Sequence, residues 1–454
     1  MSKYLKKQPN KKSKNRSSGK VSHFFFVAFL TVVILAVTLL VYQTIHSGAG
    51  TPAIGFGKTQ TPPSSEAATT KPTESSATEA SAEPTEKPTE EPTEKPTEPT
   101  ESSPEMERAQ GILDDMTLEE KIYQLFVVTP TTLTGFSGVD SAGPTTQAAL
   151  EEYPVGGIIY FDENIYGENQ LATMISNSQD YSKLPLLICV DEEGGPVSRL
   201  SGIGVTDYFD AMGVYGAELD VDRVYEIGTI LGEQIGSVGF NVDFAPVADV
   251  VTNPNNTEIG NRSFSDDPSV AAEMVEAMVR GLHEGGSISC LKHFPGHGST
   301  EADSHLGMSV THRTLDELRE TEFIPFIAGI EAGAEMVMLS HMSAPEVTGS
   351  DIPCDLSPVI VTELLREELG FTGVIITDSH EMGAILNYYE SGEAALLAIQ
   401  AGCDIVLMPN DLDDAFETIL AAVESGELTE ERINESVMRI LVMKIRAGLF
   451  DTEE

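Results

Sequence analysis

The chain has 454 residues, a formal net charge of −45 at pH 7 and no tryptophan. Nucleic-acid binding is excluded for its acidic body, because phosphate backbones attract basic surfaces. The four cysteines lie in or near apolar runs and do not form a disulfide framework, so we expect buried free thiols.

The N-terminal residues consist of two segments with opposite properties. Residues 1–20 carry eight Lys or Arg and no acid, which predicts a cytoplasmic tail. Residues 21–44 include Phe24–Tyr42, nineteen uncharged and mostly apolar residues, which is long enough for a transmembrane helix. We therefore expect a single-pass cell-membrane protein whose catalytic domain is extracellular. A cleaved signal peptide is the alternative and would lead to secretion.

Residues 45–104 are rich in Pro, Thr, Ser and Glu, and the triplet Pro-Thr-Glu occurs six times. Such a segment has too little apolar surface to form a core and is typical of a disordered, extended linker. It would hold the remaining residues, 105–454, away from the membrane as the folded domain.

The folded domain alternates short apolar runs with amphipathic stretches. Eight runs stand out: Leu125–Val128, Gly157–Phe161, Leu187–Val190, Phe240–Phe244, Cys290–Leu291, Met336–Leu339, Gly373–Ile376 and Ile405–Met408. Apolar strands alternating with helices predict a parallel sheet covered on both faces. Eight such units predict an α/β fold of the (β/α)₈ TIM-barrel type. An open, doubly wound sheet is the alternative.

Three helix starts are marked in the domain. Thr117 and Thr314 each begin a capping-box pattern, with an acid three residues later. Ser357-Pro358 is typical of an N-cap followed by proline at the first helical position.

The densest group of ionisable residues follows the fifth apolar run. The string Lys292-His293-Phe294-Pro295-Gly296-His297-Gly298 continues to Asp303 and His305. Asp303 is close enough in sequence to orient the His305 imidazole, an arrangement suited to proton transfer near neutral pH. Ordinary surface histidines are one alternative. A zinc site is another, disfavoured because the spacing of the histidines is not helical.

Ionisable residues also follow four of the other predicted strands. They are Asp191, Glu192, Glu193 and Arg199 after the third run, Asp243 and Asp249 at the fourth, His341 after the sixth, and Asp378 and His380 after the seventh. Helix capping would explain any one of them. Five strands together predict a functional site at the C-terminal end of the barrel.

Residues from about 106 to 454 resemble the catalytic barrel of glycoside hydrolase family 3, of the β-N-acetylhexosaminidase type. The strings that carry the resemblance are Gly156-Gly157-Ile158-Ile159, Asp191–Arg199, Asn241–Val250, Ile259–Phe264, Lys292–His305, Gly373–Asp378 and Ala401–Pro409. They cover most of the domain in order, and the Lys292–Gly298 string is the most diagnostic.

The resemblance implies a retaining exo-β-N-acetylglucosaminidase that uses no metal or other cofactor. It assigns the nucleophile to Asp378, which would form a covalent glycosyl intermediate. It assigns the acid/base to His305, with Asp303 as its partner. Because the chain ends about where the eighth helix should finish, we expect no second domain to supply a carboxylic acid.

The resemblance also implies the sugar contacts Asp191, Arg199, Arg262, Lys292 and His293. The expected substrates are N-acetylglucosamine-containing glycans such as peptidoglycan fragments. An alternative for Arg262 is a structural ion pair with Asp249 beneath the site. We expect His297 to be structural, and Glu381 to be an exposed helix residue rather than a group that tunes the nucleophile.

Three other functions stay open. A β-glucosidase or β-xylosidase of the same family is disfavoured by the Asp303/His305 pair. A phosphorylase is compatible with a histidine acid/base, which tolerates an anionic acceptor. A non-catalytic glycan-binding wall protein would be expected to lack Asp378 or His305. We expect a monomer that binds carbohydrate, and the membrane through its N-terminal helix.

Overall fold

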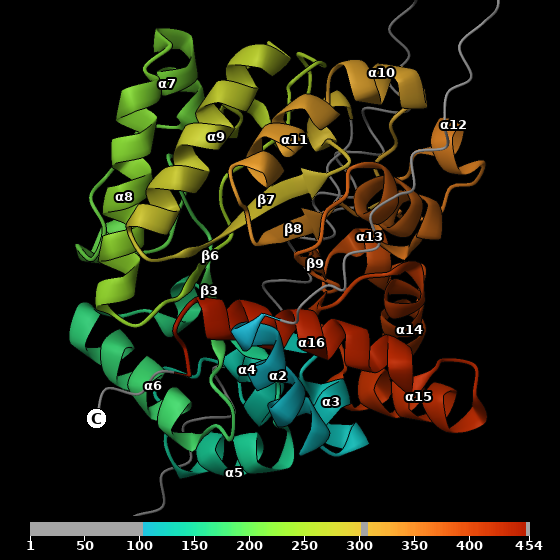
Figure 1. Cartoon of the computed structure of the whole chain (residues 1–454). Helices are drawn as coiled ribbons and strands as arrows, with labels where there is room; N and C mark the ends of the chain where they lie inside the picture. Colours follow the sequence, from blue (N-terminus) through green and yellow to red (C-terminus); the bar gives the residue numbers. More distant parts are fainter. Residues whose placement is uncertain (1–102, 301–306, 451–454) are drawn as a thin grey trace, which may run out of the picture. The chain divides into compact units, whose positions relative to one another are not determined.

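The computed structural model describes residues 103–300 and 307–450, and these form an α/β fold around a parallel eight-stranded sheet (Figure 1). The strands are β1 (Phe126–Val128), β2 (Gly157–Ile159), β3 (Leu187–Val190), β6 (Val242–Asp243), β7 (Ile288–Phe294), β8 (Met336–Leu339), β9 (Val374–Thr377) and β10 (Val406–Leu407). Their order is β10-β1-β2-β3-β6-β7-β8-β9. A parallel bridge from Ile376 to Ile405 brings the two ends of the sheet together. The predicted barrel is confirmed as a nearly closed sheet, and the open-sheet alternative is wrong.

Helices alternate with the strands and cover the outside of the sheet. The longer ones are α2 (Pro104–Asp114), α5 (Pro144–Glu152), α6 (Glu168–Tyr181), α8 (Val221–Ser237), α9 (Pro268–Glu284), α11 (Phe323–Glu331), η6 (Val359–Glu368), α14 (Ser391–Ala401), α15 (Leu412–Ser425) and α16 (Glu430–Arg446). The shorter ones are α3 (Leu118–Tyr123), α4 (Pro130–Thr134), α7 (Met212–Glu218), α10 (Leu315–Glu320), α12 (Pro345–Thr348), α13 (Gly383–Leu386) and the single turns η1 (Asp162–Asn164), η2 (Ser201–Ile203), η3 (Gly260–Arg262), η4 (His297–Ser299) and η5 (Cys354–Leu356). A small hairpin, β4 (Glu192–Gly194) with β5 (Val197–Ser198), follows β3.

The core lies inside the sheet and between the sheet and its helices. All eight barrel strands are buried, and most of their residues are apolar on both faces, as a parallel sheet requires; Asp243, Lys292 and His293 are buried charged or polar exceptions. Helices α8 and α9 pack closely because glycines meet there. A Cβ on Gly281 would lie 2.3 Å from the Tyr225 carbonyl oxygen.

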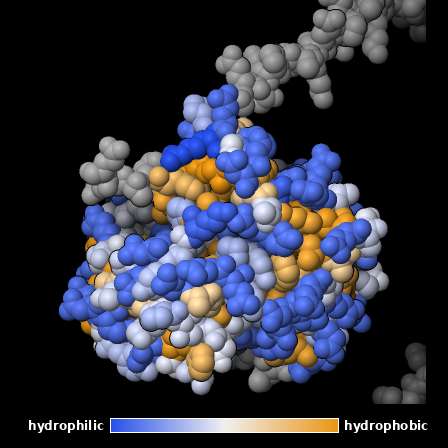
Figure 2. Space-filling model, turned by 90° about the horizontal axis from the view of Figure 1, so that it is seen from below, coloured by the Kyte–Doolittle hydropathy of each residue, from blue (hydrophilic) through white to orange (hydrophobic). Residues whose placement is uncertain are grey.

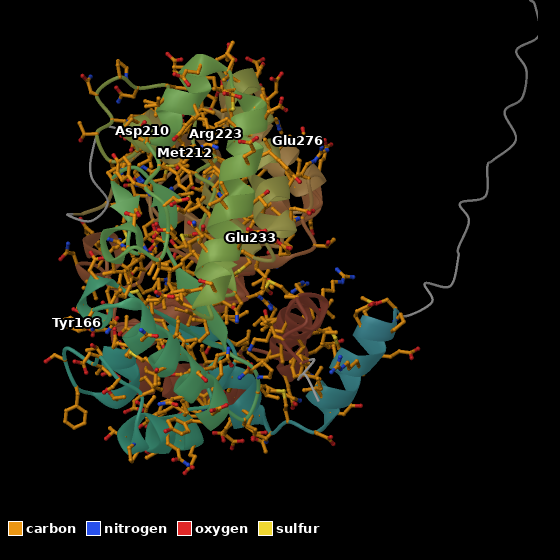
Figure 3. The ribbon with its side chains drawn as sticks, turned by 90° about the vertical axis from the view of Figure 1, so that its left-hand side faces the viewer. Tyr166, Asp210, Met212, Arg223, Glu233 and Glu276 are labelled. Atoms are coloured by element: carbon orange, nitrogen blue, oxygen red, sulfur yellow. The ribbon has the colours of Figure 1, made fainter. Side chains whose placement is uncertain are left out.

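The outer surface is predominantly polar. Glu233 of α8 is exposed, and Figure 3 shows the labelled side chains of α8 and α9 on the outside of the helix pair. The face shown in Figure 2 is mostly hydrophilic, with smaller apolar areas between the charged side chains. This division of polar and apolar residues gives the barrel a dry core and a soluble exterior.

All three predicted helix starts are confirmed. Thr117 and Thr314 both form capping boxes, with Glu120 and Glu317. The third is confirmed as well, because Pro358 has helical backbone angles while Ser357 is extended and accepts the first helical hydrogen bond, from the Val361 N–H at 3.0 Å. All four cysteines are buried and free, as expected.

The predictions for the tail, the membrane segment and the linker, residues 1–20, 21–44 and 45–104, lie outside the described residues except for the last two linker positions. Across 103–300 and 307–450, no helix is long and apolar enough to cross a membrane.

Candidate active site

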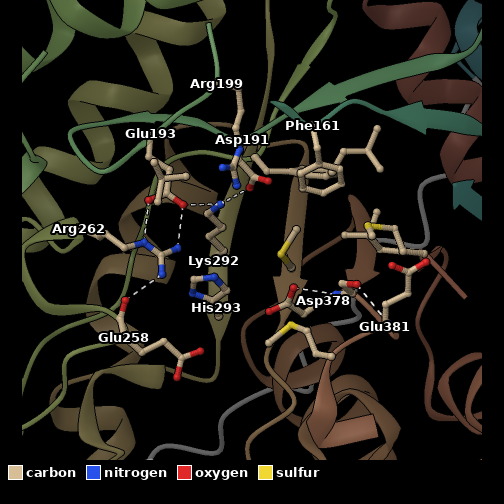
Figure 4. Close-up of a pocket in the computed structure, with 18 residues that line it drawn as sticks. Phe161, Asp191, Glu193, Arg199, Glu258, Arg262, Lys292, His293, Asp378 and Glu381 are labelled. Atoms are coloured by element: carbon tan, nitrogen blue, oxygen red, sulfur yellow. Dashed lines mark hydrogen bonds and ion pairs between the residues drawn. The ribbon is translucent and has the colours of Figure 1, made fainter. Parts of the chain in front are cut away.

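A pocket of about 400 Å³ opens at the C-terminal ends of the barrel strands (Figure 4). Its wall includes seven ionisable side chains besides His293: Asp191, Glu193, Arg199, Glu258, Arg262, Lys292 and Asp378, with Glu381 at its edge. Ile159, Phe161, Phe244, Met338 and Leu407 add apolar surface. A polar pocket of this size, with some apolar wall, suits a ligand of monosaccharide size.

Four charged side chains form one connected cluster on one side of the pocket. The Lys292 side chain is only 2% exposed, and its ammonium lies 2.7 Å from Asp191 and 2.6 Å from Glu193. Arg262 donates two hydrogen bonds of 2.8 Å to the two oxygens of Glu193 and a third, of 3.1 Å, to the Glu258 carbonyl. Two cations and two carboxylates thus neutralise one another, which is what allows them to be buried.

The pKa values of Glu193 and Lys292 in this cluster are strongly shifted. Burial opposes the charge on Glu193, but Lys292 and Arg262 outweigh it and hold its pKa well below the usual value. Burial also opposes the charge on Lys292, and here Asp191 and Glu193 raise its pKa. Glu193, Arg262 and Lys292 are therefore charged near neutral pH and present strong, directional partners for hydroxyl groups.

His293 is oriented by a carboxylate beneath the pocket. Its Nδ1 lies 2.7 Å from Asp249 Oδ2, and because a carboxylate only accepts, Nδ1 carries the hydrogen. The backbone N–H of His293 donates to the same oxygen at 3.1 Å, and that of His297 donates to Asp249 Oδ1 at 2.6 Å. Burial opposes ionisation of Asp249, yet His293 and His297 lower its pKa. Asp249 thus fixes the loop and leaves the Nε2 edge of His293 for the pocket.

His297 is structural, as predicted. Its ring is buried between the hydroxyl groups of Thr300, at 3.0 Å, and Ser309, at 3.4 Å, and burial lowers its pKa. The next residue, Gly298, is a glycine because there is no room for a side chain at this position. A Cβ there would lie 2.0 Å from the Val250 carbonyl oxygen. The sequence of this loop is therefore determined by its close packing on the segment after β6.

Asp378 lies at the end of β9, across the pocket from the charged cluster (Figure 4). Its backbone N–H donates to the Leu339 carbonyl of β8 at 3.0 Å, and its Oδ1 accepts a 2.7 Å hydrogen bond from the Ser379 N–H. The backbone therefore fixes both the position of Asp378 and one oxygen of its carboxylate, as a reacting group requires.

Arg199 and Glu381 lie at the rim. The Arg199 guanidinium lies 5.6 Å from the centre of the Phe161 ring, and it contacts Asp162 at 3.5 Å. Glu381 is exposed, as predicted, but it precedes α13 rather than lying in a helix, and it lines the pocket. Partial burial, with a contribution from Glu163, raises the pKa of Glu381.

The structure brings six of the eight predicted site residues to one pocket: Asp191, Arg199, Arg262, Lys292, His293 and Asp378. Asp303 and His305 lie outside the described residues. The alternative ion pair between Arg262 and Asp249 is wrong, because Arg262 pairs with Glu193 and Asp249 with His293.

Sequence reasoning did not select Glu193 as a site residue. It is one of two adjacent glutamates after β3, and no periodicity separates their roles. Glu192 turns away and accepts hydrogen bonds from the Arg199 and Leu200 N–H groups at 2.7 and 3.0 Å, so it shapes the hairpin. Glu193 faces the pocket. Only the contacts with Lys292 and Arg262, distant in sequence, reveal this difference.

Fold and site together define a (β/α)-barrel protein with a polar, monosaccharide-sized pocket whose charged groups come from successive strand ends. The chain belongs to glycoside hydrolase family 3, because residues 117–443 match the profile described as the glycosyl hydrolase family 3 N-terminal domain.

Relatives and solved structures share the same barrel. The chain is 33% identical over 330 residues to beta-hexosaminidase A of Pseudoalteromonas piscicida, an alignment covering 67% of this chain and 55% of that one. It is 34% identical over 278 residues to a beta-hexosaminidase of Stenotrophomonas maltophilia strain R551-3, covering 60% and 81%. A family 3 beta-N-acetylglucosaminidase structure from Paenibacillus sp. str. FPU-7 superposes with a TM-score of 0.70 at 36% identity, covering 75% of this chain and 64% of that one. The chain thus spans less than two thirds of two of these relatives.

Proposed function

We propose that this chain is a retaining exo-β-N-acetylglucosaminidase. The observation that carries the proposal is the position of Asp378 opposite the cluster of Asp191, Glu193, Arg262 and Lys292 in one pocket (Figure 4). The relatives named as hexosaminidases support the N-acetyl sugar.

The pocket supports a two-step reaction. The cluster would bind the hydroxyl groups of the terminal sugar by charge-assisted hydrogen bonds and hold its anomeric carbon near Asp378. Asp378 would attack that carbon, and the glycosidic bond would break with a proton passing from His305 to the leaving oxygen. Water would then give its proton to His305 and release the sugar from Asp378 with its β configuration retained. Asp303 would support the His305 imidazolium.

The substrate proposed is a peptidoglycan fragment or a related glycan with a terminal β-linked N-acetylglucosamine. The basic tail and the apolar segment before residue 45 support a location outside the cell, anchored in the membrane. Protease treatment of intact and lysed cells tests this: the domain should be digested in both. Protection in intact cells would contradict the location.

The activity is tested with full-length protein in detergent. We expect release of 4-nitrophenol from its β-N-acetylglucosaminide to exceed release from the β-glucoside, and the first product detected by NMR to be the β-anomer. Asp378→Asn should lower kcat by roughly 10³-fold or more because no covalent intermediate can form. Activity only on the glucoside, or α-anomer as first product, would refute the proposal. Full activity of His305→Ala would refute the acid/base assignment.

A further inference from the structure

Three buried side chains form a chain of contacts directly behind Asp378 and outside the pocket wall. They are His341 after β8, Asp355 in η5 and His380 in the turn after β9. One ring nitrogen of each histidine and one carboxylate oxygen of Asp355 lie within 4.8 Å of one another, and each side chain is at most 2% exposed. Burying two imidazoles and a carboxylate costs free energy unless they form hydrogen bonds or ion pairs with one another.

Contacts on both sides of the His341 ring determine its charge. Nε2 lies 2.8 Å from the Ser379 carbonyl oxygen, which can only accept, so Nε2 carries a hydrogen. Nδ1 lies 3.2 Å from Asp355 Oδ1. That contact is an ion pair rather than an aligned hydrogen bond. If Nδ1 carried no proton, its lone pair would face a lone pair of the Asp355 oxygen and the two would repel. A proton on both nitrogens removes the repulsion. Burial opposes this charge, but Asp355 outweighs it and raises the pKa of His341 to about 9.

His380 has the opposite character. Its Nε2 donates to Asp355 Oδ2 at 3.1 Å, while its buried Nδ1 has no hydrogen-bond partner among the described residues. A second imidazolium would leave a buried N–H unsatisfied, and burial accordingly lowers the pKa of His380. Asp355 therefore holds one charged and one neutral histidine, and together they lower its pKa to about 2.

The chain of contacts ends on the turn that carries Asp378. His341 holds the carbonyl of Ser379, whose N–H holds Asp378 Oδ1 at 2.7 Å. The N–H groups of Asp378 and His380 donate to β8 and β10 carbonyls, each at 3.0 Å. This turn is therefore tied to its surroundings by the His341 side chain and by the N–H groups of Asp378 and His380. Of these three hydrogen bonds, only the one from His341 comes from a charged group.

We propose that His341, kept positively charged by Asp355, is a positioning residue for Asp378, holding the Ser379 peptide and placing a positive charge behind the carboxylate. This inference rests on Asp378 being the nucleophile. The titratable groups that face His341 are Asp355, His380 and Asp378. The nearby Cys354 and Cys403 thiols are neutral, since burial raises their pKa values well above the usual value.

Three variants separate the hydrogen bond from the charge. His341→Gln keeps an N–H donor that reaches towards the Ser379 carbonyl but carries no charge, His341→Met loses both, and Asp355→Asn removes the counter-charge. The matched control is His283→Gln. His283 also pairs with a carboxylate, Glu335, at 2.8 Å, but at the N-terminal ends of the strands, away from the pocket.

The experiment measures kcat, KM and the pH profile of the full-length protein, with the thermal midpoint as a check on folding. We expect kcat to fall about 10- to 100-fold in Asp355→Asn and His341→Met, less in His341→Gln, with KM little changed. Wild-type kcat should also fall as the pH rises through the raised pKa of His341, about 9, because the positive charge behind Asp378 is then lost, and His341→Gln should lack this fall. The control should match the wild type.

Several results would overturn the inference. One is an alkaline fall in kcat that persists unchanged in His341→Gln, or a wild-type kcat in folded Asp355→Asn. Another is a stoichiometric metal in the wild type that Asp355→Asn lacks, because a metal would replace the proton on His341. Ring-nitrogen NMR of histidine-labelled protein reads that proton directly, and a neutral His341 at pH 7 refutes the charge whatever the activity. An inactive wild type, or an active Asp378→Asn, would instead overturn the proposed function.

Discussion

Replacing Glu193 by glutamine tests the charged cluster most directly. The amide has nearly the same shape but loses the negative charge that faces Lys292 at 2.6 Å and Arg262 through two 2.8 Å hydrogen bonds. Lys292 keeps Asp191, while Arg262 keeps only the Glu258 carbonyl among the partners described. The variant therefore leaves a buried guanidinium without its counter-charge.

Removing one partner of a buried pair costs about 3–5 kcal/mol. For a folded domain of this size the unfolding entropy converts that loss to a fall of about 4–7 °C in Tm. The same change should lower kcat/KM, because Lys292 and Arg262 are no longer held in place for the sugar. Calorimetry and nitrophenol release check the two effects on one preparation.

The pH dependence of stability is an independent test of the direction of the Glu193→Gln effect. The pKa of Glu193 in the folded protein lies well below its ordinary value of 4.5, so its stabilising effect is fully present above that pH and is lost as the pH falls from 4.5 towards the folded pKa. The stability difference between wild type and Glu193→Gln should therefore be largest near neutral pH and shrink in acid. The control Glu226→Gln breaks an exposed pair with Arg223 and should cost less than about 1 kcal/mol. Equal losses in the two variants, or none in Glu193→Gln, would refute the reasoning.

Three further predictions concern other buried features. Burial lowers the pKa of Lys444 to about 7, so between pH 7 and 10.5 the unfolded chain binds a proton that the folded chain does not, and wild-type stability should rise with pH across that range. Denaturation curves of Lys444→Met should lack this rise. The same rise in both proteins would contradict the prediction. Gly298→Ala would place a Cβ 2.0 Å from the Val250 carbonyl and should cost about 1–3 kcal/mol, whereas Gly202→Ala, with open space around it, should be near neutral by the same Tm measurement. Arg262→Lys keeps the charge but loses the two-pronged contact with Glu193 and should lower kcat/KM about tenfold or more; an unchanged value would show that the fork is dispensable.

The barrel was predictable because its signal is local and repeated. Each apolar run corresponds to a strand, and helix starts such as Thr117 are marked by residues three apart. Proximity of the charged residues at one end followed from the parallel strands, which is why Asp191, Lys292 and Asp378 were expected together. Element boundaries were less accurate. β7 extends to Phe294, beyond the two apolar residues that predicted it.

By itself the sequence determined the fold class, the family and which strand ends carry chemistry, because periodicity and motif strings are properties of neighbouring residues. Only the tertiary structure decided the pairing of those residues. Adjacent Glu192 and Glu193 have opposite roles, Arg262 pairs with Glu193 rather than Asp249, and Asp355 joins two histidines from different strand ends. Such choices depend on distances of a few ångströms between side chains far apart in the chain, since electrostatic and hydrogen-bond energies change steeply over that range.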